Sequence, residues 1–260
     1  MTANSSLPSY ASPPLSEVSI GLQFKHLEQM KVPHFGQFWA RIKKDFPIIE
    51  HAPPIVGKDQ DFNTWAMLPR IWFIDKSDTQ LLQLQTDRLN FNWRFRDGAD
   101  PYPRFHTIAP RFFELLKIFE EFLAEDGVGV IVPTVAELTY VNVLERGREW
   151  NTVEDISAVF KDFMWEQKEH RFLPNPKGIS WAATFELPQL QGLLSARLKQ
   201  AVRISDQQEI MQFDMVANYP VQETSLQDLI PWYELAHEWI VRGFDDLTRP
   251  EIQKKFWGKK

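Results

Sequence analysis

Four hydrogen-bonding side chains alternate with large apolar ones along a short stretch of the sequence. This alternation is typical of a half-buried strand, in which neighbouring side chains point to opposite faces. The polar members are Arg88, Asn90, Asn92 and Arg94, and the apolar members are Leu89, Phe91, Trp93 and Phe95. Guanidinium groups offer a planar fork of donors, and asparagine amides offer both a donor and an acceptor. We therefore predict that the polar row is a surface that binds an anion or an amide.

The same row has a second interpretation, in which its members only pair with acidic neighbours across the strands of a solvated sheet. Arg94 would then pair with a carboxylate and contribute to folding. The preceding segment, Gln80–Gln85, has the opposite parity, with Leu82 and Leu84 on one face. This change of parity at Thr86–Arg88 predicts a tight turn or a β-bulge between two strands.

Other residue patterns that could support chemistry are weaker. The sequence contains no glycine-rich phosphate loop, zinc-protease motif or serine-hydrolase motif. Glu234-x-x-His237 has the spacing of a carboxylate-bridged metal helix, but such sites need a second E-x-x-H on a facing helix. A solvated helix face with a Glu238–Arg242 pair is the simpler interpretation. The six histidines are scattered.

Carboxylates near the central strands could bind a divalent metal, as in a nuclease. They are Asp59, Asp61, Asp75, Asp78 and Asp87. Aspartate is also common in loops and turns because its side chain bonds the nearby backbone. We therefore predict no catalytic residue, no metal site and no cofactor, and keep a metal-dependent nuclease or hydrolase as an alternative.

Composition excludes several classes of protein. Hydrophobic residues make up 43% of the chain and charged residues 25%, as in a folded, water-soluble protein. A net charge of −6 argues against bulk attraction to nucleic acid or to an anionic membrane. No window approaches the roughly 20 apolar residues of a membrane span. The absence of cysteine fits a cytoplasmic location.

The first half of the chain reads as strand, helix, two or three strands and a second helix. Its first strand is Glu17–Lys25, and the segment through Pro53 and Gly57 is predicted to be a loop. The first helix carries Phe35, Phe38, Trp39, Ile42 and Phe46, and Pro47 should end it. Later strands are predicted at Arg70–Asp75 and within Gln80–Arg96. Thr107 should cap the second helix, whose buried stripe is Ile108, Phe112, Leu115, Phe119 and Phe122.

The second half follows a similar order roughly 110 to 120 residues later. Its first strand is Glu137–Leu144, and Thr152 with Asp155 should cap a helix that carries Ile156, Val159, Phe160 and Phe163. Further strands are predicted at Ile179–Leu187, Leu193–Ile204 and Ile210–Tyr219. A final helix follows, in which Pro231 marks a kink or the first turn.

These elements predict an α+β fold in which tandem duplicated β-α-βββ-α units form a curved antiparallel sheet with helices on one face. Residues 1–14 should be a disordered tail, followed by a first repeat at 15–127 and a second at 128–260. Arg197 and Lys199 would then be the counterparts of the polar row in the second half. Gln212, Asp214 and Asn218 would lie on the strand next to them.

The motif Q-x-Q-x-D-R-x-x-x-N-W-R is the most specific part of a wider resemblance. Its residues are Gln83, Gln85, Asp87, Arg88, Asn92, Trp93 and Arg94. With residues 15–24, 34–47, 70–74, 102–105, 138–144 and 256–258, the chain resembles a sporadically distributed, functionally uncharacterised family of bacterial and archaeal proteins of similar length. The resemblance implies no activity or substrate. The patchy distribution of that family resembles that of accessory genes, including phage-defence and toxin–antitoxin systems.

Three functions remain open. The first is a non-catalytic binding module for an unknown protein partner, such as an accessory of a defence or toxin–antitoxin system. The second is a sensor that binds a small anionic or aromatic ligand on the open sheet face. The third is the metal-dependent hydrolase. The binding residues predicted for the first two functions are Arg88, Asn90, Asn92, Arg94, Arg197 and Lys199. We predict no membrane partner, and nucleic acid is an unlikely partner.

Overall fold

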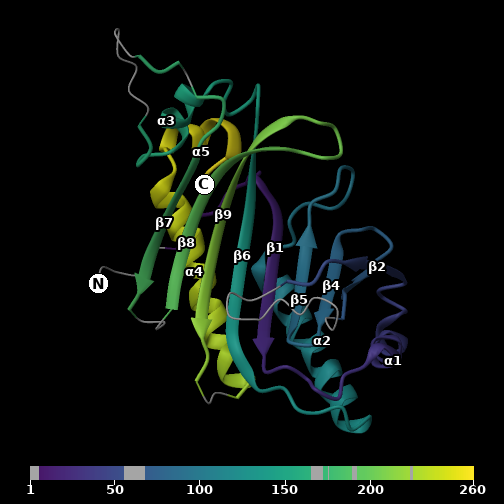
Figure 1. Ribbon diagram of the computed structural model, residues 1–260. Coiled ribbons are helices and arrows are strands. Elements are labelled where there is room, and N and C mark those ends of the chain that lie inside the picture. The colour runs from purple at the N-terminus through teal and green to yellow at the C-terminus, as the bar shows by residue number, and fades with distance from the viewer. Residues whose placement is uncertain (1–5, 56–67, 165–171, 175, 189–191, 223–224) are drawn as a thin grey trace. The chain divides into compact units, whose positions relative to one another are not determined.

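A computed structural model of the chain describes residues 6–55, 68–164, 172–174, 176–188, 192–222 and 225–260. Within them, nine strands form one antiparallel sheet in the order β2-β3-β4-β5-β1-β6-β9-β8-β7 (Figure 1). The strands are β1 (Leu15–Phe24), β2 (Ile48–Ala52), β3 (Arg70–Ile74), β4 (Gln80–Gln85), β5 (Arg88–Arg94), β6 (Pro133–Glu145), β7 (Ser180–Leu187), β8 (Gly192–Val202) and β9 (Glu209–Pro220). The helices are α1 (Val32–Ile42), α2 (Phe105–Glu125), α3 (Ile156–Val159), α4 (Ile230–Leu247) and α5 (Pro250–Trp257). The predicted α+β class is confirmed.

The chain divides into two compact units, each assembled from separate segments. Unit 1 comprises Met1–Ser16, Thr139–Ala217 and Glu234–Lys260, and unit 2 comprises Glu17–Leu138 and Asn218–Tyr233. The predicted repeats were continuous segments, 15–127 and 128–260. In the strand order, β1 neighbours β5 and β6 neighbours β9, so the first strand of each half lies beside the last strand of that half. Duplication itself stays a prediction.

Unit 2 packs α1 and α2 on one face of its strands. Phe38 of α1 lies edge-on to Phe73 of β3 at 5.9 Å and to Phe119 of α2 at 5.1 Å. The whole predicted stripe of α2 is buried. The helix begins earlier than predicted, at Phe105, after Arg104 in a positive-φ conformation. Thr107 therefore lies within the first turn and does not cap the helix.

Strand β2 was missed because it carries no periodic signal. Its first four residues are exposed, and it pairs only with β3, at the edge of the sheet. An edge strand needs no alternation of apolar residues to keep its backbone bonds. The predicted turn is confirmed, since Gln85 pairs with Arg88 and only Thr86 and Asp87 connect β4 to β5.

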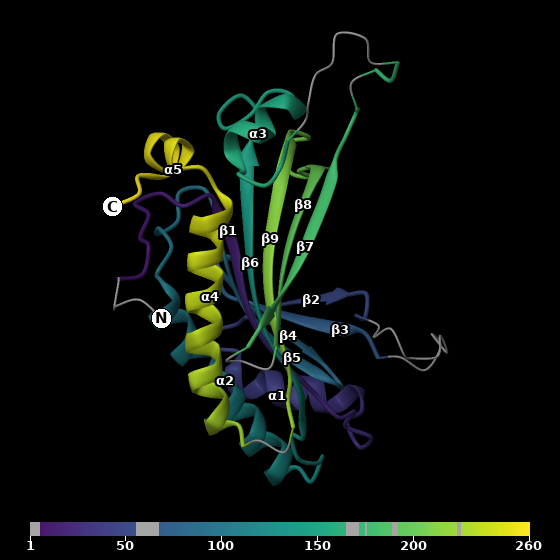
Figure 2. The same cartoon turned by 90° about the vertical axis from the view of Figure 1, so that its left-hand side faces the viewer.

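Unit 1 places α4 along β8 and β9 (Figure 2). Phe213, Met215 and Ala217 of β9 are fully buried, and Gly243 of α4 lets the helix approach them. Pro231 lies in the first turn of α4, one of the two predicted positions. The predicted Thr152–Asp155 capping box is present. The helix that follows is a single turn, which ends before Phe160.

The N-terminal segment is not a free tail, which corrects the prediction for the described residues before 14. Tyr10 is buried and forms an isolated bridge with Lys259. The backbone amides of Ala11 and Ser12 donate to the carbonyls of Gly258 and Trp257, each at 3.1 Å. The Ser/Pro-rich composition concealed this docking, which depends on one aromatic residue. None of the described helices has the length and apolarity needed to cross a membrane.

Candidate functional site

The polar row of β5 keeps its predicted parity but does not lie on an open face. Phe91 and Trp93 are buried on the helix side, as predicted. However, only 7% of Arg88 and 2% of Asn92 are exposed. Phe95, predicted to be in the core, lies beyond the end of β5 and is exposed. The expectation of a solvated row is therefore wrong for Arg88 and Asn92.

A chain of hydrogen bonds crosses four strands and explains the burial of Asn92. The indole Nε1 of Trp72 donates to Oε1 of Gln83 at 3.1 Å. Nε2 of Gln83 donates to Oδ1 of Asn92 at 2.8 Å, and Nδ2 of Asn92 donates to Glu17. Asn90 packs on Gly21, where a Cβ would lie 2.6 Å from its Oδ1. Because the groups of the chain satisfy one another, Asn92 serves the packing of β3, β4, β5 and β1, and Asn90 packs between β5 and β1 at Gly21.

Arg94 pairs with a carboxylate, as in the second interpretation of the polar row. Its Nη2 donates to Asp78, which also accepts from Nε of Arg96 at 2.6 Å. The side chain of Arg94 is 11% exposed, and that of Asp78 is 47% exposed. Burial lowers the pKa of Arg94, and the charge of Asp78 opposes this effect.

Arg197 and Lys199 are exposed on β8 of unit 1. The carboxylate of Asp214 on β9 lies within range of both charges, as the predicted strand pairing requires. Burial raises the pKa of Asp214, although the Gln212 amide bonds it at 2.8 and 2.9 Å and the two cations act in the opposite direction. Arg197 and Lys199 therefore form a small charged cluster with Asp214 in unit 1.

The carboxylates and histidines considered for metal binding have other partners. Asp75 accepts from the backbone N–H of Gln80 at 2.8 Å, and Asp87 pairs with Arg88 at 3.2 Å. His237 Nδ1 lies 2.8 Å from the Tyr140 hydroxyl. Asp59 and Asp61 lie outside the described residues. Within the described part of the chain, no group of three or more potential metal ligands comes together.

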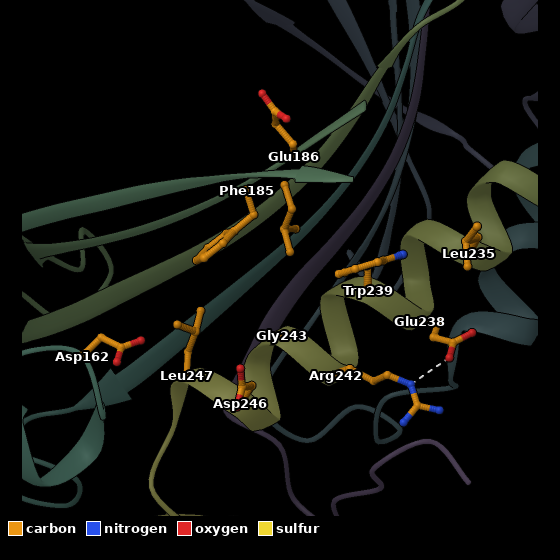
Figure 3. Close-up of a pocket in the computed structure, with 11 residues that line it drawn as sticks. Asp162, Phe185, Glu186, Leu235, Glu238, Trp239, Arg242, Gly243, Asp246 and Leu247 are labelled. Atoms are coloured by element: carbon orange, nitrogen blue, oxygen red, sulfur yellow. Dashed lines mark hydrogen bonds and ion pairs between the residues drawn. The ribbon is translucent and has the colours of Figure 1, made fainter. Parts of the chain in front are cut away.

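A feature that the sequence did not predict is a cavity of about 700 Å³ in unit 1, between α4 and the strands β7 and β8 (Figure 3). Its lining combines apolar and charged side chains. Phe185 and Leu194 contribute from the strands, and Leu235, Trp239 and Leu247 contribute from the helix. In β7, Phe185 points toward α4 while the next residue, Glu186, points away from it (Figure 3).

The position of α4 has an identifiable cause. A Cβ at Gly243 would lie 2.9 Å from Cε of Met215 and 3.4 Å from Cδ2 of Leu194. The glycine thus permits close packing against β9 at this point of the helix. Next to it, Phe185 stays 41% exposed instead of being covered by a helical side chain. The result is an open hollow beside a tightly packed contact.

Charged groups at the cavity are mainly acidic. They are Asp162, Glu238, Asp246 and Arg242, which give three carboxylates and one guanidinium, while Glu186 lies at the edge and points away from α4 (Figure 3). Arg242 is paired with Glu238 at 2.7 Å, the i,i+4 pair predicted from the sequence. Lys161 lies 3.8 Å from Asp246. With Lys161 included, these three carboxylates outnumber the two cations by one.

A second hollow, of about 650 Å³, lies in unit 2 between α2 and the strands. Arg111 crosses this region and pairs with Asp45 at 2.6 Å and with Glu114 at 2.7 Å. These contacts raise the pKa of Arg111 in spite of its burial. Since its main charges are already paired with one another, we regard the α4 cavity as the better candidate site.

The chain matches no protein-family model, no curated protein and no solved structure. The assignment of a site therefore depends on geometry and chemistry. A sequence signal for the cavity does exist in α4, where Leu235 and Trp239 lie four residues apart, beside the core stripe of Tyr233, Ala236 and Ile240. A second apolar stripe on a helix indicates a second contact surface.

Proposed function

We propose that this protein is a non-catalytic binding protein whose α4 cavity holds a small organic molecule with an apolar, aromatic or branched body and a positively charged end. The observation that carries the proposal is the cavity that the described residues leave open, walled by Phe185, Leu194 and Trp239. Its volume of about 700 Å³ falls within the roughly 300–1,000 Å³ of small-molecule sites. This proposal keeps the ligand-sensor hypothesis and its aromatic ligand, but it moves the ligand from the sheet face to the cavity and replaces the anionic ligand by a cationic one.

The apolar walls favour binding of a hydrocarbon body. Each buried methylene contributes about 0.8 kcal/mol, and an aromatic pair in offset or edge-on geometry adds about 0.5–1.5 kcal/mol. Trp239 and Phe185 lie on the helix and strand sides of the cavity, so a planar ligand can contact both (Figure 3). No reaction is proposed, because the described cavity residues include no histidine or hydroxyl nucleophile.

The acidic rim favours a cationic end. Asp162 and Asp246 are exposed at the rim, where an ammonium group of the ligand would keep part of its hydration. An anionic ligand of the same shape would meet like charges, which cost binding free energy. Charge therefore supplies selectivity while the walls supply most of the affinity.

A matched series of ligands tests the proposal. Phenethylamine, phenethyl alcohol and phenylacetate share one aromatic body and differ in charge. Ligand-observed NMR on the wild-type protein should show binding that weakens in that order, with saturation transfer strongest at the ring protons. Equal signals for all three, or the strongest signal for phenylacetate, would contradict the proposal.

Exposed apolar side chains in unit 1 favour a second candidate, the protein-binding module. Phe172 is 98% exposed, and Met164 and Ile204 are also largely exposed. A partner that covered these side chains would gain the free energy of burying their apolar surface. Under this candidate, changing all three to serine abolishes capture of a partner from the native host and leaves phenethylamine binding unchanged. If capture persists in this variant, the second candidate fails.

A further inference from the structure

Arg70 and Arg88 lie in register with each other, on the face of the unit 2 strands that the helices do not cover. Arg70 begins β3, one residue before the Ile71–Leu84 pair, which places it level with Gln85 at the end of β4. Gln85 pairs in turn with Arg88 at the start of β5. Directly paired residues point to the same face, so both arginines share a face two strand spacings apart, about 10 Å.

The charge of this arginine pair is not balanced by the described residues. Nε and Nη2 of Arg88 donate to the two carboxylate oxygens of Asp87, each at 3.2 Å. Arg70 makes no ion pair with any described residue, and its buried Nε has no hydrogen-bond partner. Its guanidinium lies over the Trp72 ring at 5.4 Å. Among the residues that the structure describes, two guanidinium groups thus face one carboxylate.

The neighbouring groups hold the arginines in place without neutralising them. The Gln85 amide is fully engaged with the backbone of Ile55, since its Oε1 accepts at 2.9 Å and its Nε2 donates at 3.1 Å. Burial lowers the pKa of Arg70, and the positive charge of Arg88 lowers it further. The Nε of Arg70 lacks a hydrogen-bond acceptor among the described residues, and the charges of Arg70 and Arg88 repel each other. Both features favour the binding of a negatively charged acceptor.

We propose that Arg70 and Arg88 bind an oxyanion, either a phosphate group or a carboxylate, between their guanidinium groups. The oxyanion would accept from the guanidinium of Arg70, which has no ion pair with a described residue, and from the donors of Arg88 that Asp87 does not use. Guanidinium groups match the geometry of both anions through paired N–H donors. This oxyanion site is separate from the α4 cavity, and neither proposal depends on the other.

The test uses thermal melts of the full chain in chloride buffer at fixed ionic strength. Sodium phosphate, AMP and sodium acetate are titrated separately, which distinguishes free phosphate, a phosphate ester and a carboxylate. We expect at least one of them to raise the melting temperature of the wild type in a saturable way. Arg70→Met should weaken that anion at least tenfold, whereas the control Arg41→Met, on α1 of the same unit, should leave its affinity unchanged.

A second measurement separates an anion site from a structural role. Without any oxyanion, Arg70→Met should melt at or above the temperature of the wild type, because it removes one of two like charges. If Arg70→Met folds poorly, Arg70→Gln serves in the same titration, since it keeps a donor and loses the charge. A response that is equal in wild type and in the Arg70 variants, or no saturable response to any of the three anions, overturns the proposal.

Discussion

The hydroxyl of Tyr10 donates a 2.7 Å hydrogen bond to Oδ1 of Asp245, 235 residues later in the chain. The Tyr10 ring also lies edge-on to Phe244 at 5.5 Å and to Trp257 at 6.4 Å. Burial, together with this hydrogen bond, raises the pKa of Tyr10 well above its ordinary value. The Tyr10 side chain, together with the backbone hydrogen bonds of Ala11 and Ser12, therefore anchors the N-terminal segment to the end of α4 and to α5.

This anchor predicts separate contributions from the ring and from the hydroxyl. Tyr10→Phe should lower the free energy of unfolding by about 1 kcal/mol, the typical net value of one hydrogen bond. Tyr10→Ala should cost about 3–5 kcal/mol, as for other buried aromatic side chains. Urea denaturation of both variants measures these losses. A Tyr10→Ala protein as stable as wild type would mean that the segment does not dock in solution.

Trp93 and Arg94 are neighbours on β5 with different surroundings. Trp93→Ala should cost about 3–5 kcal/mol because the side chain is buried against α2. Arg94→Ala should cost less, about 1–2 kcal/mol, because the carboxylate left behind on Asp78 is half exposed and can be hydrated. Urea melts compare the two. An equal loss would show that the Arg94 pair is as important to folding as the core.

Two helical glycines should respond in opposite ways to alanine. A Cβ at Gly36 of α1 would meet nothing within 4 Å, so Gly36→Ala should stabilise by about 0.5–1 kcal/mol through helix propensity. At Gly243 the same change should destabilise by about 1–2 kcal/mol, because Met215 is fully buried and must move. Thermal unfolding of both variants checks the contrast. Stabilisation at both positions would show that Met215 moves freely.

Asp214 gives a prediction that depends on pH. Burial raises its pKa in the folded state above the unfolded value near 3.8. The contribution of protonated Asp214 to stability is therefore fully present below the unfolded-state pKa. It is lost as the pH rises through the folded-state pKa. Asp214→Asn should be more stable than wild type at pH 7, and this difference should vanish near pH 3.

Asp206 supplies the control of opposite sign. Its hydrogen bonds with Arg203 lower its pKa, so its contribution is present at pH 7 and is lost as the pH falls through the folded pKa. Asp206→Asn should therefore lose stability at pH 7 only. Melting temperatures of both variants across pH 3–8 decide the matter. If Asp214→Asn is less stable at pH 7, the attraction of Arg197 and Lys199 outweighs the burial of Asp214.

Local signals predicted much of the secondary structure. The apolar stripe of α2, the parity change at Thr86–Asp87 and the Thr152–Asp155 capping box each depend on residues close in sequence. Strand β2 was missed because exposed edge residues need no periodicity. The docking of Tyr10 was missed because its partners lie more than 230 residues away.

The candidate site was less predictable for a related reason. The alternation in β5 indicated which residues share a face, but not what covers that face, so the burial of Arg88 and Asn92 could not be read from it. The α4 cavity depends on how Phe185, Leu194 and Trp239 from three elements leave space unfilled. Only the second apolar stripe of α4 indicated it.

Calorimetric titration of phenethylamine into three proteins tests the central claim most directly. Phe185 is 41% exposed in the cavity wall, and Phe95 is 47% exposed in unit 2, so their changes to alanine remove similar surfaces at little cost in stability. The account predicts that Phe185→Ala loses at least tenfold in affinity, while Phe95→Ala binds like the wild type. Equal affinity in all three proteins, or no heat of binding to the wild type, would contradict it.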